Sequence, residues 1–125
     1  MQASEILYRK LRKFSEKLFA TYKRSNKLPC TIIGAEHKEI KRVDHSGKVP
    51  NPLCDKLKRE LIKIAPLGTK GIDNYVGCCC EVRASNQIIE LRNSVPIKAI
   101  VFTKAIRPRT GQTIRRCKNC RQVFG

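Results

Sequence analysis

The sequence is organised around two short stretches, GCCCEVRA at positions 77–84 and RCKNC at positions 116–120. The first stretch contains a Cys-x-Glu arrangement, and the second contains a Cys-x-x-Cys arrangement. A Cys-x-x-Cys pair that joins a further cysteine from elsewhere in the chain is typical of a metal site with sulfur ligands. The candidate metal ligands are therefore Cys79, Cys117 and Cys120.

Glu81 follows the first of these cysteines by two residues, which suits a group that moves protons beside a metal without binding it. Zinc takes about four ligands, so three thiolates leave one position for water. A nearby glutamate can take a proton from that water and pass it to a ring nitrogen and then to a leaving amino group. Attack at C4 of cytosine or C6 of adenine would then release ammonia. The pattern thus predicts a zinc-dependent base deaminase with Glu81 as its catalytic residue.

Charges near the cysteines favour the thiolate form that zinc requires. Cys79 and Cys117 each stand at the predicted start of a helix, where the partial positive charge of the helix end stabilises a thiolate. Three thiolates exceed the charge of one Zn2+, which weakens the metal as a Lewis acid. We expect Arg115 and Arg116, directly before Cys117, to offset that excess.

Other interpretations of the cysteines and histidines stay open. Cys78 or Cys80 can act as a fourth ligand, which would close the metal site and make it structural. A thioredoxin-like redox pair is disfavoured, because the Cys-x-x-Cys does not follow a first strand. His37 and His45 are candidate ligands or bases, although a single histidine in a loop is more often simply exposed. The remaining cysteines are expected to be small buried apolar residues, namely Cys30 and Cys54.

The composition is that of one globular domain whose cysteines are reduced or bind metal. The chain has 125 residues, enough for a single core, and 41% of them are apolar. Seven cysteines are an odd number, which does not suit a scaffold held by disulfides alone. No stretch approaches the roughly 20 apolar residues of a membrane helix, and no signal-peptide pattern opens the sequence. We therefore expect no membrane partner.

Positive charge is the strongest feature of the composition. Lys and Arg number 27 against 10 Asp and Glu, which gives a net charge of +17. Such an excess attracts polyanions and indicates contact with nucleic acid, either DNA or RNA. A pocket for a neutral base has no use for this charge, so a polymer is the expected substrate. A solvated basic surface and an acidic protein partner are the alternatives.

Hydrophobic periodicity predicts four helices, at residues 4–22, 53–64, 79–92 and 117–124. The first helix has its apolar residues on one face and most of its Lys and Arg on the others. Three residues are expected to end it, namely Ser25, Asn26 and Pro29.

Runs of β-branched and apolar residues predict a small sheet. Residues 30–35 and 39–43 form the expected antiparallel hairpin, which ends at 44–47. The apolar run 99–102 predicts a strand within 97–103 that is covered on both faces. A helix followed by such a strand indicates a crossover unit, and a basic loop is expected after it at residues 107–111.

From about Pro29 to Gly125 the sequence resembles the deaminase-fold toxin domains at the C-termini of bacterial polymorphic toxins, particularly the YwqJ-like group. The matching segments are 31–35, 46–47, 52–53, 79–86, 107–111 and 117–120. The segment around Glu81 is the most specific, since such domains carry Cys-Ala-Glu-Val followed by a small residue and Asn. Arg116 stands where many deaminases have Pro, and Cys80 stands in the place of Ala.

The resemblance implies zinc at the three cysteines already named, with Glu81 as the proton shuttle. It also implies a secreted or contact-delivered effector that acts in the cytoplasm of a target cell. A cognate immunity protein, expected to be acidic, would neutralise it.

The expected fold is α/β, a cytidine-deaminase-like α/β/α sandwich. Its short mixed sheet would consist of the hairpin and one crossover strand, and it would be abbreviated at the C-terminus because the sequence stops five residues after Cys120. The basic helix of residues 1–28 is expected to pack on the deaminase domain of residues 29–125, so that the whole forms one domain.

The expected function is hydrolytic deamination of a nucleobase, cytosine before adenine, in DNA or RNA. Lys104, Arg107 and Arg109 are expected to contact the nucleic-acid backbone. Weaker candidates for substrate contact are Ser46, Arg83 and Asn86. The alternatives are a non-enzymatic nucleic-acid-binding module stabilised by zinc and a deaminase of free nucleosides.

Overall fold

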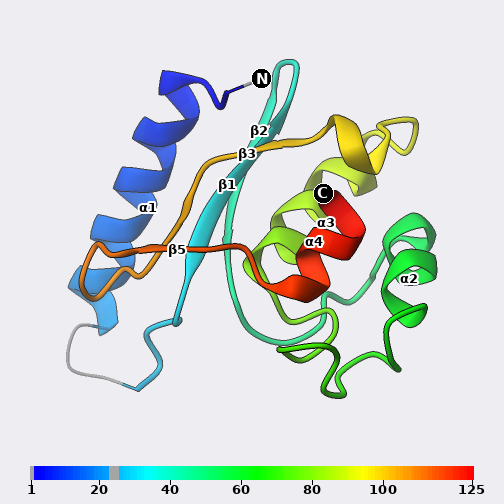
Figure 1. Cartoon of the computed structure of the whole chain (residues 1–125). Helices are drawn as coiled ribbons and strands as arrows, with labels where there is room; N and C mark the ends of the chain where they lie inside the picture. Colours follow the sequence, from blue (N-terminus) through cyan, green and yellow to red (C-terminus); the bar gives the residue numbers. More distant parts are fainter. Residues whose placement is uncertain (1, 23–25) are drawn as a thin grey trace.

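The structure, a computed structural model, describes residues 2–22 and 26–125. Over these residues four α-helices surround a five-stranded sheet (Figure 1). The helices are α1 Glu5–Tyr22, α2 Asp55–Ile62, α3 Cys80–Leu91 and α4 Lys118–Phe124, with a 3-10 turn η1 at Ile97–Ala99. The strands are β1 Ile32–His37, β2 Ile40–His45, β3 Val101–Phe102, β4 Ala105–Ile106 and β5 Thr113–Ile114.

All four predicted helices are confirmed, with ends within a few residues of the expected ones. Helix α1 ends at Tyr22, and Ser25 lies outside the described residues. In the described part of the chain, none of the helices is both long and apolar enough to cross a membrane.

The predicted hairpin is confirmed, and its first strand, β1, lies at the centre of the sheet. Strand β1 pairs antiparallel with β2 along its whole length, from Ile32 opposite His45 to His37 opposite Ile40. On its other edge β1 pairs antiparallel with β3 and β4, and β4 pairs antiparallel with β5. The expectation of a mixed sheet is therefore wrong for the described residues. Strand β3, which follows α3, runs parallel to β2, but the two strands are not paired because β1 lies between them. Every pair of neighbouring strands is therefore antiparallel.

The expected single strand at 97–103 is also wrong in detail. Residues 97–99 form η1, and Val101 and Phe102 are half-buried rather than covered on both faces. Thr103 then interrupts the edge: its N–H donates to Gly34 O at 2.9 Å, and its Oγ1 accepts from Gly34 N at 2.9 Å. The Thr103 hydroxyl thus takes the place of a backbone carbonyl in the pairing with β1, and the pairing continues with β4.

Strands β4 and β5 were not expected, because two residues are too few to show an alternating pattern. They flank the predicted basic loop, which the structure confirms as a turn at 108–110. Arg107 N–H donates to Gln112 O at 2.8 Å, and this bond closes the β4–β5 hairpin.

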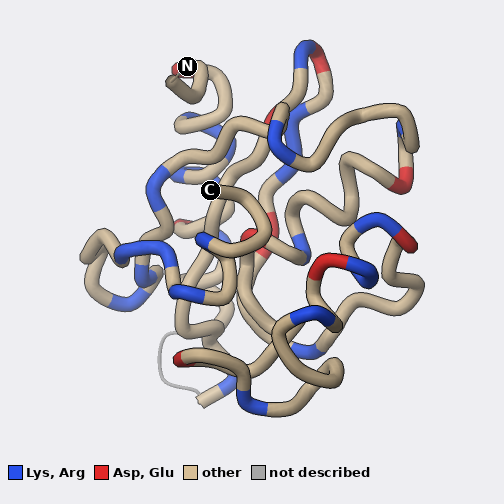
Figure 2. Tube along the Cα trace, turned by 45° about the vertical axis from the view of Figure 1, so that its right-hand side comes forward, with Lys and Arg blue, Asp and Glu red and all other residues tan. Residues whose placement is uncertain are grey.

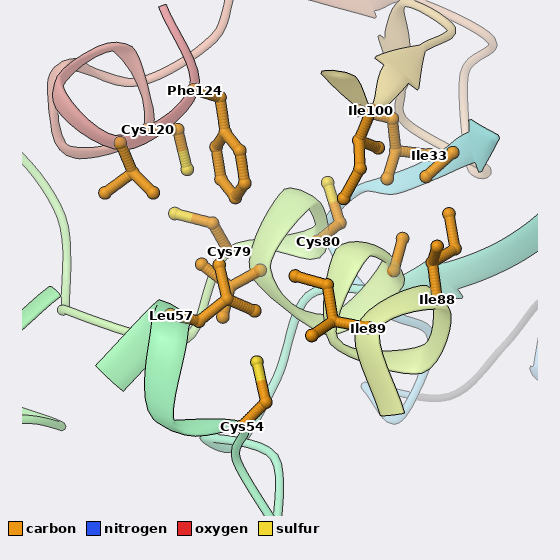
Figure 3. Close-up of a cluster of buried hydrophobic side chains, with 14 of the residues drawn as sticks. Ile33, Cys54, Leu57, Cys79, Cys80, Ile88, Ile89, Ile100, Cys120 and Phe124 are labelled. Atoms are coloured by element: carbon orange, nitrogen blue, oxygen red, sulfur yellow. The ribbon is translucent and has the colours of Figure 1, made fainter. Parts of the chain in front are cut away.

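Helices lie on both faces of the sheet, which confirms the α/β class. Leu7 and Leu11 of α1 are buried on the side of β1 that carries Ile32. Ile33 and Ala35 alternate to the opposite side, where they join the main core with the apolar residues of α3. Helix α4 adds Phe124 to the same core, next to α2 (Figure 3).

Two cysteines outside the cluster behave differently from each other. Cys54, at the N-cap of α2, is buried as expected. Cys30 is exposed, so its expected burial is wrong. Cys30 precedes the first core residue of β1 by two positions and lies in the bend that leads into the strand.

We predict that Gly34→Ala destabilises the protein by about 1–3 kcal/mol, because the added methyl overpacks the α1 side of the sheet. A Cβ at this position would lie 2.9 Å from Leu7 Cγ and Cδ1 and 3.0 Å from Thr103 Cγ2. Leu7 is fully buried and has no room to move away. Urea unfolding measures the effect, with Gly47→Ala as the control, since a Cβ at Gly47 meets nothing closer than 3.6 Å. Equal stability of the two variants would contradict the close packing of α1 on β1.

Candidate metal centre

The structure brings the three predicted ligands together. The Sγ atoms of Cys79, Cys117 and Cys120 all lie within 4.8 Å of one another, and those of Cys79 and Cys117 are 3.2 Å apart. Cys79 and Cys120 are buried, and Cys117 is half-buried. Figure 3 shows the sulfurs of Cys79 and Cys120 pointing toward each other between the start of α3 and α4. Three sulfurs at these separations could hold a metal ion.

Two helix starts provide this geometry. Cys79 is the N-cap of α3 and Cys117 is the N-cap of α4, as the sequence predicted. An N-cap side chain usually accepts a hydrogen bond from its own helix, but within the described chain neither thiol does so. Asp73 caps α4 instead, since Lys118 N–H donates to its Oδ1 at 3.0 Å and to its Oδ2 at 3.1 Å. The Cys117 sulfur is thereby left to the cluster.

Asn119 ties α4 to the loop before α3. Its side chain is 1% exposed, accepts from Ile72 N–H at 2.8 Å and donates to Asn74 O at 2.7 Å. Asn74 in turn donates from Nδ2 to Cys79 Sγ at 3.4 Å. The loop is so close that a Cβ on Gly71 would lie 2.6 Å from Asn119 Oδ1. This loop therefore fixes both halves of the cluster.

Sequence reasoning missed Asp73, Asn74 and Asn119 as residues of the site. Their only trace in the sequence is that Asn119 lies between the two cysteines of Cys-x-x-Cys, and that Asp73 and Asn74 lie in a polar loop shortly before Cys79. Polar residues in such places are usually read as a turn. The contact between residues 72–74 and 118–119 spans 45 to 47 positions, so it becomes visible only in the fold.

The three cysteines share protons unequally in the metal-free chain. The neighbouring Cys120 and Cys79 thiols, followed by the positive end of α4, lower the pKa of Cys117 well below the usual thiol range. The same sulfur–sulfur contacts with Cys117 raise the pKa of Cys79 and of Cys120 above the usual thiol range. Cys117 is thus the cluster thiol that loses its proton most readily, and a bound metal would displace the protons that remain on the cluster.

No other side chain of the described residues completes the cluster. Cys80 points away from it (Figure 3) and donates to Glu81 Oε1 at 3.3 Å. Cys78 lies outside the group. His37 and His45 also lie outside it. His45 Nδ1 is 2.7 Å from Ser46 O, whereas His37 Nδ1 is buried and without a partner in the described chain. The arrangement is therefore three cysteines, and not the closed four-cysteine site.

Glu81 lies beside the cluster in the first turn of α3 and is 4% exposed. Burial raises the pKa of this carboxyl above its usual range, and the charge on Cys117 raises it further. Arg116 acts in the opposite sense, with its Nε 3.7 Å from Glu81 Oε2. Glu81 is thus a buried carboxyl whose pKa is raised by burial, although a backbone hydrogen bond, the Cys80 thiol and the Arg116 cation all act in the opposite direction.

Glu81 also lines an open cleft of about 820 Å³. The cleft has a basic wall formed by Lys104, Arg115, Arg116 and Arg121. Several Lys and Arg positions accordingly lie close to the C-terminus in Figure 2. In the described chain no cysteine of the cluster lines the cleft, whereas Glu81 and Arg116 lie in its wall and in contact with each other.

Of the predicted substrate contacts, Lys104 lines the Glu81 cleft and the others do not. Arg107 and Arg109 lie at the turn between β4 and β5. Arg83 and Asn86 line a different cleft of about 470 Å³ on another side of α3. Arg83 Nε is 3.4 Å from Asp44 Oδ1 and its Nη1 donates to Lys48 O at 2.6 Å.

Asn86 and Ser46 make hydrogen bonds within the fold. Asn86 donates to Pro52 O at 2.9 Å and accepts from Cys54 N–H at 2.8 Å, so it holds the entry to α2. Ser46 Oγ accepts from Thr31 N–H at 3.3 Å, at the end of the β1–β2 hairpin. Their part in substrate binding stays a prediction.

Comparison with known proteins finds no family model that matches this chain, no matching curated protein and no matching solved structure. The support for a function is therefore the geometry of the cluster and of the cleft beside it.

We predict that Asn119→Ala lowers the free energy of unfolding by about 1–3 kcal/mol, because the buried Asn119 side chain loses its hydrogen bonds with Ile72 N–H and Asn74 O, each worth about 0.5–1.5 kcal/mol. Urea unfolding of the metal-free protein measures this. The exposed Asn93 provides the control, since Asn93→Ala should change stability by less than about 0.5 kcal/mol. A loss at Asn119 no larger than at Asn93 would show that the loop does not fix α4.

We predict that Cys120→Ala weakens metal binding more than about 100-fold, since even changes outside the ligand set cost about 10–100-fold. Competition with a chromophoric chelator measures the affinity for Zn2+, and Co2+ absorption reports thiolate ligation. Cys54→Ala is the control, because Cys54 is also buried but lies outside the cluster. Metal affinity that falls equally in both variants would mean that the sulfur cluster is not the site.

Proposed function

We propose that this protein is a zinc-dependent hydrolytic deaminase that acts on a nucleobase in DNA or RNA, with cytosine as the first candidate. The observation that carries the proposal is the pairing of an incomplete sulfur cluster with a buried carboxyl. Three Sγ atoms lie within 4.8 Å of one another, and Glu81 lies beside them in the wall of an open cleft.

The cysteine cluster fits zinc. A tetrahedral ion with Zn–S bonds of about 2.3 Å separates its sulfurs by roughly 3.8 Å. The observed separations are 3.2 Å for one pair and at most 4.8 Å for any pair, so small side-chain movements reach that value. With three ligands from the described residues, the fourth position is left for water. When bound, zinc supplies the Lewis acid with which this class of enzyme activates water.

Glu81 has the properties of the proton carrier that such a reaction needs. Its carboxyl accepts from the Cys80 thiol at Oε1, and its Oε2 lies 3.7 Å from Arg116 Nε. Burial makes the carboxyl more basic than usual, which helps it take a proton from water. The same carboxyl would deliver that proton to the ring nitrogen of the base and then to the leaving amino group.

The charge of the cleft supports a polymeric substrate. Four cations and one carboxylate line it, namely Lys104, Arg115, Arg116, Arg121 and Glu81. The chain as a whole carries a net charge of +17. A phosphate backbone uses such a surface, whereas a free nucleoside does not. A deaminase of free nucleosides would instead act on cytidine at a rate that does not depend on salt.

One observation favours a second function, that of a nucleic-acid-binding module in which zinc is structural. In the described chain none of the three cysteines lines the cleft, which suits a metal that does not meet the substrate. In that case Glu81 would contribute to the local charge balance only, and its removal would leave the protein's activity unchanged.

We further propose that the chain serves as a toxin effector, delivered by secretion or contact into the cytoplasm of a target cell. The support is the sequence resemblance described above. The net positive charge of the chain suits neutralisation by an acidic immunity protein.

We predict that Glu81→Gln lowers deamination by about 100- to 10,000-fold, the range that general acid–base groups contribute. The Gln side chain keeps the size of Glu but cannot carry the proton. Zinc content and thermal stability should be nearly unchanged. Glu90→Gln is the matched control, on the same helix but exposed and away from the cleft.

Sequencing nucleic acid from cells that express the wild-type chain provides the readout, with C-to-T changes for cytosine and A-to-G changes for adenine. Wild-type and Glu81→Gln cells with the same mutation rate and the same growth would refute the enzyme proposal and favour the binding module.

A further inference from the structure

A second basic cleft adjoins the one that contains Glu81. It measures about 810 Å³ and lies between residues 98–102 and the tip of the β1–β2 hairpin at residues 36–38. Its cations are Lys38, Lys98 and Arg116. Its one carboxylate, Glu36, accepts hydrogen bonds from Ser4 N–H at 3.1 Å and from Ser4 Oγ at 2.8 Å. The second cleft therefore carries a net positive charge.

The two clefts meet at Arg116, which lines both. They also follow one continuous stretch of chain, because residues 98–102 line the second cleft and residues 103–105 line the first. The Arg116 guanidinium lies 5.0 Å from the ring centroid of Phe102 and 6.0 Å from that of Phe124, and Nη1 donates to Gly125 O at 2.6 Å. A cation held in place thus marks the junction of the clefts.

The second cleft combines charge with ring surfaces. His37 and Phe102 both line it, next to the cations already named. Together the two clefts present six cations and two carboxylates, counted from their lining residues. Cations along a groove beside aromatic rings are typical of single-strand binding, since the rings stack unpaired bases while the cations follow the phosphates. An acidic protein would use the charges but not the rings.

We propose that the second cleft binds the phosphodiester backbone of a single-stranded nucleic acid, on the far side of Arg116 from the base that enters the Glu81 cleft. Lys38 and Lys98 contact phosphates, and the rings of His37 and Phe102 take the neighbouring bases. The path of the strand rests on the proposed deaminase function, whereas the binding site itself does not.

The test is binding of a fluorescein-labelled 12-residue oligothymidylate to the full chain, measured by anisotropy over a range of salt concentrations. Thymine has no exocyclic amine to remove, so the measurement is independent of deamination. We expect the double variant Lys38→Gln/Lys98→Gln to bind about tenfold more weakly. The slope of its log affinity against log salt should become shallower by about 1.4, the value for two lost phosphate contacts. Phe102→Leu should weaken binding without changing that slope.

The control is Lys58→Gln/Arg59→Gln, which removes the same charge from α2, where neither residue lines the two clefts. An equal loss in both double variants would overturn the proposal, because net charge alone would then explain binding. The proposal would also be overturned if the wild-type chain bound polyglutamate with the same affinity as oligothymidylate. That result would assign the cleft to an acidic protein. Oligothymidylate binding that depends on Lys38 and Lys98 in a chain without deaminase activity would uphold the second cleft while the proposed enzyme function failed.

Discussion

The packing of two helix starts against each other is the constraint on which the site depends. Cys79 and Cys117 are 38 positions apart in the chain, yet their sulfurs are 3.2 Å apart because α3 and α4 begin side by side. The arrangement holds through the loop before α3, where Asp73 caps α4 and the buried Asn119 binds back to that loop. Capping by Asp73 is what leaves the Cys117 sulfur available to the other two. The core of β1 and α3 then sets where this pair of helix starts lies relative to the sheet.

Arg116 connects the site to its surroundings. Its side chain lines the Glu81 cleft, and its Nε lies 3.7 Å from Glu81 Oε2. Its guanidinium lies over the rings of Phe102 and Phe124. In this fold it joins three elements, β3, α3 and the end of α4, and it places a fixed cation where two clefts meet. Six of the 27 Lys and Arg residues thus line the two clefts along which the proposed substrate would lie.

Local patterns were sufficient for the elements that bury a regular stripe. The seam that includes Leu7 and Leu11, the helix after Cys79 and the β-branched run at Ile32 and Ile33 all have periods that only one element satisfies. The patterns were insufficient where an element is too short to show a repeat, as with the two-residue strands β4 and β5. They were also insufficient where a side chain replaces a backbone acceptor between strands, as with Thr103. They also placed Cys30 in the core, because a cysteine beside a strand shows no sign of which side of the bend it occupies.

The sequence by itself determined one pair of neighbouring sulfurs and the sign of the net charge. Cys-x-x-Cys fixes two sulfurs on one turn of helix, and an excess of 17 positive charges does not depend on the fold. Only the tertiary structure decided that a third sulfur joins them, that Cys78 and Cys80 stay outside, and that Glu81 lies in the wall of a basic cleft. The physical reason is distance along the chain. Contacts between residues some forty positions apart depend on how the helices pack on the sheet, and no local spacing encodes that packing.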